Sequence, residues 1–227
     1  YLDDIIKFNV VNESKQYVIL AAGYDSRANR LKLPSDLDIF ELDQPEVQRR
    51  KLSILDKIVP RSKKTNYVEI DFNQDSISEK LLNAGFDTEK NTIFTLEGIL
   101  QYISKDSFES TLKEISELTK RSKATIVFSY TDCIINKYPE NLFGKEYPKP
   151  REKVDKIKKI INALSEPWIS FYSIKEIEKL LNKNNFHLKE VKNLENLNNK
   201  YFSSVNRKIV SRNLFNLENF VLAKNFK

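Results

Sequence analysis

The sequence predicts one α/β domain built on a mostly parallel, doubly wound sheet. The chain has 227 residues, of which 40% are hydrophobic, enough for one large core. Short apolar runs of strand length alternate with segments of helical periodicity, and this order is typical of parallel sheets. Two further apolar runs near the end of the chain predict that an antiparallel hairpin closes the sheet. We expect a single domain over residues 1–227.

The expected elements follow the chain in order. Buried strands are predicted at residues 17–22, 38–42, 67–70, 92–96 and 124–130. Helices are predicted between them at residues 44–58, 76–83 and 104–118, with a proline in the first turn of the first and a serine cap on the third. The helix-breaking stretch YPENLFGKEYPKP follows the fifth strand, and residues 138–165 are expected to form a lid or insertion. Two more helices at 151–163 and 173–182 precede strands near 186–191 and 220–222.

Composition excludes several functional classes. The single Cys133 cannot build a disulfide framework or a zinc cluster, so no metal is expected. No apolar run approaches the roughly 20 residues of a membrane span, and the acidic start YLDD does not resemble a signal peptide. The net charge of +6 is spread along the chain rather than gathered in a stripe, which argues against nucleic acid. We therefore expect a soluble cytoplasmic protein without a membrane or nucleic-acid partner.

Chemistry is expected where the strands end, because ligands of doubly wound sheets bind beyond the carboxyl ends of the strands. Ala21 and Gly23 follow the first strand and allow a ligand to approach the backbone closely. Asp43 follows the second strand and can accept the hydroxyls of a ribose. Asp71 and Phe72 follow the third, where they could bind and cover an adenine ring. The alternative is that the aspartates only cap the helices that follow them.

The fourth strand ends in Glu97-Gly98. Carboxylates at neighbouring strand ends suit a ligand with a sugar and a cationic sulfonium better than a phosphate-rich dinucleotide.

The motifs in these positions resemble a known family. QYVILAAGYDSRANRL, IFELDQPEVQRRK, VEIDF, GFDTEKNTIFTLEGILQYIS, SEPWISFYS and NFVLAK are similar, in this order and spacing, to successive motifs of the leucine carboxyl methyltransferase family. That family includes bacterial polyketide carboxyl O-methyltransferases. The resemblance runs from Tyr1 nearly to Lys227.

The resemblance implies a Rossmann-like class I methyltransferase fold, S-adenosylmethionine as the methyl donor, and a carboxylate of a small molecule or a protein C-terminus as the acceptor. It places Ala21 and Gly23 beside the methionine part of the donor, Asp43 at the ribose, and Asp71 with Phe72 at the adenine. Glu97 matches a carboxylate that contacts the donor.

Two features depart from the family pattern. The glycine-rich loop usually reads Gly-Ala-Gly, whereas its first position here is Ala21, whose methyl group narrows the approach to the donor. The family also has an N-terminal helical segment that carries a donor-binding arginine and covers the acceptor, and it lies before the stretch matched by YLDD. The chain starts with Tyr1 and has no methionine, so we expect an N-terminally truncated sequence with impaired or absent catalysis.

The sequence assigns no catalytic acid or base. A carboxylate acceptor is already ionised at neutral pH, so methyl transfer needs positioning rather than a base. Arg27, Arg30, Tyr102 and Tyr130 are the candidates for acceptor binding. The alternatives are that Arg30 pairs with an acidic neighbour on its helix and that Tyr102 packs under the following helix. His187 and Cys133 are expected to be structural. Two alternatives remain: a phenol or hydroxyl O-methyltransferase, and a non-catalytic donor-binding or scaffold domain.

Overall fold

The computed structural model describes residues 1–58, 65–72, 74–163 and 167–226. Seven strands in this part of the chain form one sheet, in the order β3-β2-β1-β4-β5-β7-β6. The first five strands pair in parallel, whereas β7 pairs antiparallel with both β5 and β6. The strands are β1 (Gln16–Leu20), β2 (Asp38–Asp43), β3 (Thr65–Glu69), β4 (Thr92–Leu96), β5 (Ala124–Thr131), β6 (His187–Asn193) and β7 (Glu218–Lys224).

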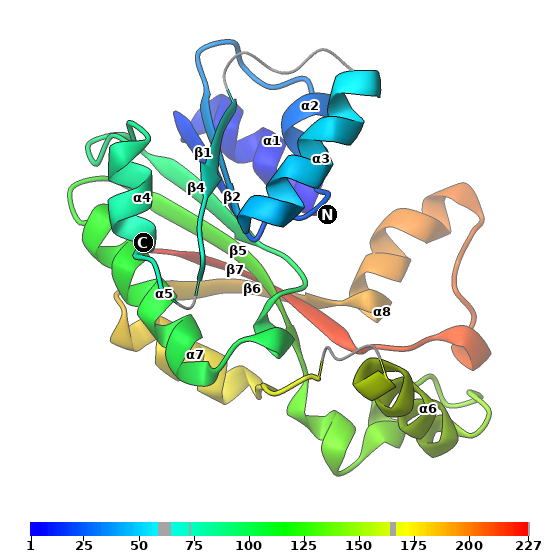
Figure 1. The fold of residues 1–227 in the computed structure, drawn as a ribbon. Helices are drawn as coiled ribbons and strands as arrows, with labels where there is room; N and C mark the ends of the chain where they lie inside the picture. The colour runs from blue at the N-terminus through cyan, green and yellow to red at the C-terminus, as the bar shows by residue number, and fades with distance from the viewer. Residues whose placement is uncertain (59–64, 73, 164–166, 227) are drawn as a thin grey trace.

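Helices cover both faces of the sheet (Figure 1). Helices α1 (Leu2–Asn12), α2 (Arg27–Arg30) and α3 (Pro45–Ile58) lie on one face, and α4 (Ile77–Asn83), α5 (Lys105–Leu118) and α7 (Ile174–Lys183) lie on the other. Helix α6 (Pro150–Ala163) stands apart from the sheet, beyond the end of β5. The predicted doubly wound sheet with an antiparallel C-terminal pair is therefore confirmed.

Serine caps begin three of these helices. The hydroxyls of Ser76, Ser104 and Ser173 each accept a hydrogen bond from the backbone N–H three residues later, at the first turns of α4, α5 and α7. At α7 the N3 residue Glu176 bonds back to the N–H of Ser173, which completes a capping box. The predicted helix starts at 76 and 104 thus correspond to real caps.

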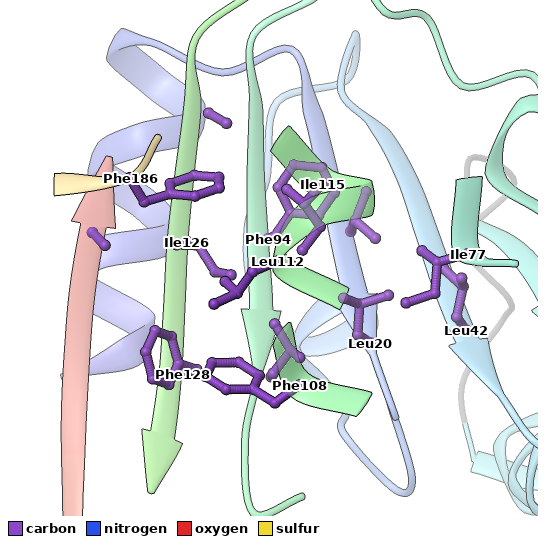
Figure 2. Packing of buried hydrophobic residues seen from close by; sticks show 14 of the residues in the cluster. Leu20, Leu42, Ile77, Phe94, Phe108, Leu112, Ile115, Ile126, Phe128 and Phe186 are labelled. Carbon is purple, nitrogen blue, oxygen red and sulfur yellow. The ribbon is translucent and has the colours of Figure 1, made fainter. Parts of the chain in front are cut away.

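The larger hydrophobic core lies between the sheet and the α4–α5–α7 layer. Figure 2 shows Phe108 of α5 beside Phe128 of β5, with ring centroids 5.1 Å apart. A second cluster lies on the opposite face, where Leu2, Ile6 and Val10 of α1 pack against the sheet. Burial of apolar side chains on both faces explains why β1, β4 and β5 read as continuous hydrophobic runs.

The structure differs from the predictions mainly at element ends and in the N-terminal region. β1 ends at Leu20 rather than at residue 22, because Ala21 takes a left-handed conformation with φ of 51° that no strand accommodates. Helices α1 and α2 were not predicted. The last two strands are longer than expected, and their connection holds α8 (Leu194–Leu197) and several short turns.

The predicted lid at 138–165 contains a 3₁₀ turn, η3 (Pro139–Leu142), followed by α6, and its residues 164 and 165 lie outside the described part of the chain. Val154 of α6 is buried against Ile135, Leu142 and Phe143 in a separate small cluster. This segment therefore has a core of its own, and its action as a lid stays a prediction, as does the single-domain boundary.

Among the described helices, none combines the length and the apolar character that a membrane crossing requires.

Candidate donor site at the carboxyl ends of the parallel strands

The parallel register aligns the ends of three central strands. Leu20 of β1 lies opposite Leu42 of β2 on one side and opposite Leu96 of β4 on the other. The residues that follow these leucines are Ala21 after β1, Asp43 in β2 and Glu97 after β4. All three therefore lie side by side at the carboxyl ends of the strands. Residues predicted from separate motifs are thus brought together, as expected of a doubly wound fold.

The loop after β1 is held in shape by two aspartates. Ala21 and Gly23 both have positive φ, 51° and 47°. The N–H of Gly23 donates to Asp43 Oδ2 at 2.5 Å, and the N–H of Gln44 donates to Asp43 Oδ1 at 2.7 Å. Asp25 accepts from the N–H of Arg27 at 2.8 Å. Asp43 therefore joins the β1 loop to Gln44, the residue before α3, and neither of these two bonds goes to an N–H within α3.

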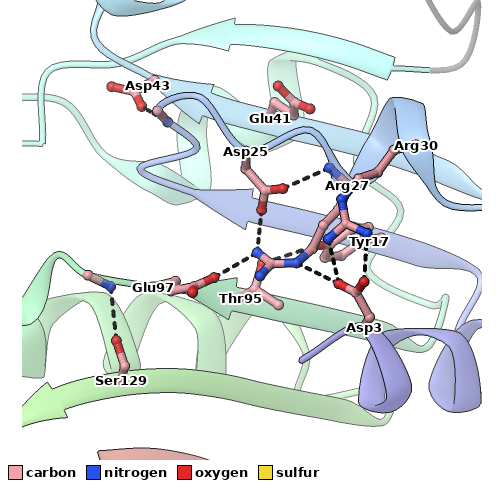
Figure 3. Close-up of polar contacts among 12 residues, drawn as sticks. Asp3, Tyr17, Asp25, Arg27, Arg30, Glu41, Asp43, Thr95, Glu97 and Ser129 are labelled. Atoms are coloured by element: carbon pink, nitrogen blue, oxygen red, sulfur yellow. Dashed lines mark hydrogen bonds and ion pairs between the residues drawn. The ribbon is translucent and has the colours of Figure 1, made fainter. Parts of the chain in front are cut away.

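Arg27 lies at the centre of a cluster of carboxylates (Figure 3). Its Nη1 is 2.7 Å from Asp25 Oδ2 and 2.7 Å from Glu97 Oε2, and its Nε is 3.1 Å from Asp3 Oδ1. Arg30 makes two further contacts with Asp3, at 2.6 and 2.8 Å. One guanidinium thus joins α1, the loop after β1 and the end of β4.

Electrostatics favour the ionised forms of Asp3 and Arg27. Hydrogen bonding from Arg30, opposed by burial and assisted by Arg27, lowers the pKa of Asp3 to about 2. Burial alone would lower the pKa of Arg27, but the carboxylates of Asp25 and Glu97 raise it. Three carboxylates face two guanidinium groups, so the cluster carries an excess of negative charge. It favours a ligand with cationic groups.

A cavity of about 390 Å³ opens over this cluster. Ala21, Gly23, Asp25, Arg27 and Glu97 line it, together with Arg30 and Thr95. Glu97 is its more accessible carboxylate, with 40% of the side chain exposed against 13% for Asp25. The cavity therefore offers a carboxylate oxygen and backbone groups to one ligand.

A second, smaller and mainly apolar cavity shares Leu20 and Ala21 with the first. Its other walls are Phe72, Leu96, Ile99 and Ile103, with Ser107 and Thr111 of α5 at one side. The cavity volume is about 30 Å³, so its apolar walls offer a contact surface for a flat ring but do not enclose one. Leu20 and Ala21 thus line both cavities, so a ligand with a polar and an aromatic half could contact both from the end of β1.

The predicted residues do not all line these cavities. Asp43 is only 8% exposed, because its carboxylate is directed to backbone N–H groups. Asp71 accepts from the side-chain amide of Gln74 at 2.9 Å, beside Phe72. Tyr102 is exposed at the end of the 3₁₀ turn Leu100–Tyr102 after β4, whereas Tyr130 is 2% exposed in the core, with its ring edge-on to Tyr172. Arg27 and Arg30 line the cavity, but both are already paired with carboxylates.

Sequence reasoning missed Asp3, Ser129 and Glu218. The hydroxyl of Ser129 accepts from the N–H of Gly98 at 2.9 Å and so fixes the turn after Glu97. Burial raises the pKa of Glu218, which hydrogen-bonds to the same serine and lies near Glu97. The acidic start YLDD was the only signal in the sequence that could have pointed to Asp3. Nothing in the sequence links Asp3 to Arg27, which lies 24 residues away.

The two residues set aside as structural lie away from the cluster. His187 begins β6 at an exposed position, and Cys133 begins a 3₁₀ turn (Cys133–Asn136) after β5. Burial raises the pKa of the Cys133 thiol, which opposes use as a nucleophile. Within the described residues, no group of three or more His, Cys, Asp or Glu side chains is arranged to hold a metal ion.

The family model for leucine carboxyl methyltransferase matches residues 1–116, which carry α1, the first four strands and the whole cluster around Arg27. The chain belongs to the leucine carboxyl methyltransferase family. The resemblance read from the motifs is thereby confirmed.

Curated relatives that the chain matches are longer than the chain itself. The Bacillus subtilis protein named "Putative S-adenosyl-L-methionine-dependent methyltransferase YktD" is 29% identical over 92% of this chain and 65% of its own length. A protein of the same description from Mycolicibacterium vanbaalenii is 42% identical over 46% of this chain and 34% of its own length. The chain thus spans less than two thirds of these relatives.

Solved structures show the same fold at low sequence identity. Magnesium protoporphyrin IX methyltransferase from Synechocystis PCC 6803, solved with bound SAH, aligns over 98% of this chain and 81% of its own, with a TM-score of 0.55 and 11% identity. An O-methyltransferase family protein from Burkholderia thailandensis aligns over 98% of this chain and 54% of its own, with a TM-score of 0.56 and 11% identity. The Rossmann-like methyltransferase fold predicted for this family member is confirmed.

Proposed function

We propose that the chain binds S-adenosylmethionine and is the donor-binding core of a methyltransferase that acts on a carboxylate oxygen. The observation that carries the proposal is the pair of cavities that share Ala21 as a lining residue, one lined by the carboxylates of Asp25 and Glu97 and the other by Phe72 and Ile99. Family membership and the names of the curated relatives support the same donor.

The residues fit the donor by the chemistry of their atoms. Glu97 would accept from the amino group of the methionine part, and the excess negative charge of the cluster favours the sulfonium. The free lone pairs of Asp43 would accept the ribose hydroxyls, while Asp71 and Phe72 would bind the adenine. When bound, S-adenosylmethionine supplies an electrophilic methyl group.

The chain's own contribution to transfer is orientation. A carboxylate acceptor needs no proton removed at neutral pH, and the described site offers no histidine for that purpose. Catalysis would come from holding the acceptor oxygen in line with the methyl group. Tyr102, close to the end of β4, is the most exposed of the acceptor candidates that carry a hydroxyl. Its role, and those of Arg27, Arg30 and Tyr130, stay predictions.

One observation favours a hydroxyl acceptor as a second candidate. The guanidinium groups of Arg27 and Arg30, the cations that line the larger cavity, are both paired with carboxylates, so an anionic acceptor would meet excess negative charge. A hydroxyl acceptor avoids that repulsion but needs a base, for which Glu218, whose carboxylate lies near Glu97, would be available. Its rate would rise with pH, whereas the rate with a carboxylate would stay flat near neutral pH.

Calorimetric titration with S-adenosylhomocysteine tests the donor site without turnover. Micromolar binding is the expected result, and absence of binding would favour a scaffold protein over an enzyme. If the donor binds, donor with a labelled methyl group is then supplied with small carboxylates and with the corresponding alcohols and phenols. Methyl esters release methanol in alkali and methyl ethers do not, so the product identifies the acceptor class.

A further inference from the structure

The guanidinium of Arg27 joins three parts of the molecule that are distant in sequence. It contacts Asp25 in the loop after β1, Glu97 at the end of β4, and Asp3 in the first turn of α1. Only 15% of the Arg27 side chain is exposed, so the contacts are shielded from solvent more than surface ion pairs are. The position of α1 and the position of Glu97 are therefore set by the same group.

The planar guanidinium makes this link specific. An arginine presents five N–H donors in a fixed fork, so a change at one carboxylate redirects the donors available to the others. Nη1 is shared by Asp25 and Glu97, while Nε is used by Asp3. Arg30 donates to both oxygens of the same aspartate, including the Oδ1 that Arg27 Nε contacts. Loss of Asp3 would free Nε and let Arg27 turn further towards Glu97.

We propose that Arg27 is a positioning residue that couples the docking of α1 to donor binding, with Asp3 as its partner on the helix. While Asp3 holds Nε, Glu97 keeps an oxygen free for the amino group of the donor. The coupling is reciprocal, because a ligand that binds better to one arrangement must also stabilise that arrangement. Donor binding therefore tightens α1 against the sheet. This inference rests on the proposed donor site.

The test compares two aspartates in the first turn of α1. Asp3→Asn removes the carboxylate next to Arg27, whereas Asp4→Asn is the matched control, since Asp4 accepts from Tyr201 Oη at 2.6 Å and does not contact the cluster. Both changes remove one negative charge from the same helix start, so a general loss of helix stability affects both. Calorimetry with S-adenosylhomocysteine is performed on the full 227-residue chain.

We expect Asp3→Asn to weaken S-adenosylhomocysteine binding by about five-fold or more, and Asp4→Asn to leave it within about two-fold. Asp3→Glu should recover part of the loss, because it restores a carboxylate. Hydrogen exchange gives a second readout: S-adenosylhomocysteine should slow exchange in α1 of the unchanged chain and of Asp4→Asn, but much less in Asp3→Asn. Equal affinities for the unchanged chain and Asp3→Asn, or equal protection, would overturn the coupling.

Failure of the donor site itself gives a different result. If the unchanged chain binds no S-adenosylhomocysteine, the proposed function fails, and the link is judged from unfolding of Asp3→Asn, Glu97→Gln and the double variant. If the effects of Asp3→Asn and Glu97→Gln on the free energy of unfolding are not additive, Arg27 couples the two carboxylates. Additive effects would show that Arg27 does not couple them.

Discussion

The backbone N–H of Gly23 donates to Asp43 Oδ2 at 2.5 Å, across the gap between the ends of β1 and β2. This bond uses a buried carboxylate to hold a loop whose backbone has positive φ. The same carboxylate is the proposed acceptor of the ribose hydroxyls. Asp43 thus serves the loop and the ligand together, and its replacement should affect both.

Replacement of Asp43 should weaken donor binding. We expect Asp43→Ala to reduce the affinity for S-adenosylhomocysteine by about 1.5 to 3 kcal/mol, the range for hydrogen bonds to a charged group. Asp38→Ala is the control, because Asp38 lies at the opposite end of β2, where it pairs with Lys90 at 3.0 Å. Calorimetry measures both variants. An unchanged affinity for Asp43→Ala would refute the ribose assignment.

Glycine at position 21 should stabilise the protein. Ala21 has φ of 51°, a conformation that costs a residue with a Cβ about 1 kcal/mol. We therefore expect Ala21→Gly to raise the free energy of unfolding by up to about 1 kcal/mol in urea titration. The adjacent Ala22→Gly should instead lower it, because Ala22 is buried and its φ is not positive. Changes of the same sign at both positions would rule out backbone strain at Ala21.

The buried pair of Lys51 and Glu41 should be sensitive to loss of its cation. Lys51 Nζ lies 2.5 Å from Glu41 Oε2, and both side chains are almost fully buried between β2 and α3. Removal of one partner leaves an uncompensated charge, so Lys51→Met should destabilise the fold by about 3 to 5 kcal/mol at pH 7. The double variant with Glu41→Gln should recover part of this loss. A single variant as stable as the unchanged protein would contradict the structure.

The pH dependence of Lys51→Met has a definite sign. Burial already raises the pKa of Glu41, and Lys51 is the main opposing influence. A raised pKa in the folded state gives stability that is present below the unfolded value of 4.5 and is lost as pH rises. The deficit of Lys51→Met should therefore shrink as pH falls from 7 towards 4. Urea titrations over this range measure it.

Glu176 should show the opposite dependence. Hydrogen bonding from Lys105, together with the backbone N–H of Ser173, lowers the pKa of Glu176 to about 2. Stability from this group is present above its unfolded value of 4.5 and is lost as pH falls towards 2. Glu176→Gln should thus destabilise the protein at pH 7 and have little effect near pH 2. The control Glu178→Gln lies on the same helix, outside the capping box, and should change little at either pH.

The sequence predicted the sheet better than the site. Strands β1, β4 and β5 are buried on both faces, so their apolar runs are unambiguous, and the serines at 76 and 104 locate the helices that follow β3 and β4. Helix α1 was missed because its buried positions alternate with exposed apolar ones such as Phe8 and Val11, which hide the periodicity.

The site was predicted as a set of positions but not as a network. The predicted strand ends placed Ala21, Gly23, Asp43 and Glu97 together at the carboxyl ends of the strands, because the parallel register alone brings these residues together. The contacts of Arg27 depend on the docking of α1 and on side-chain directions that no local pattern encodes. For the same reason Arg27 and Arg30 looked like free cations in the sequence and are paired in the structure.

The order of strands in the sheet also bears on how the chain folds during synthesis. β6 is made before β7, yet in the described sheet its neighbour is β7, which separates it from β5. While the ribosome is still adding the residues between them, β6 has no partner to pair with. The parallel half with the Arg27 cluster can assemble during that interval, and the antiparallel edge can join only when β7 has emerged.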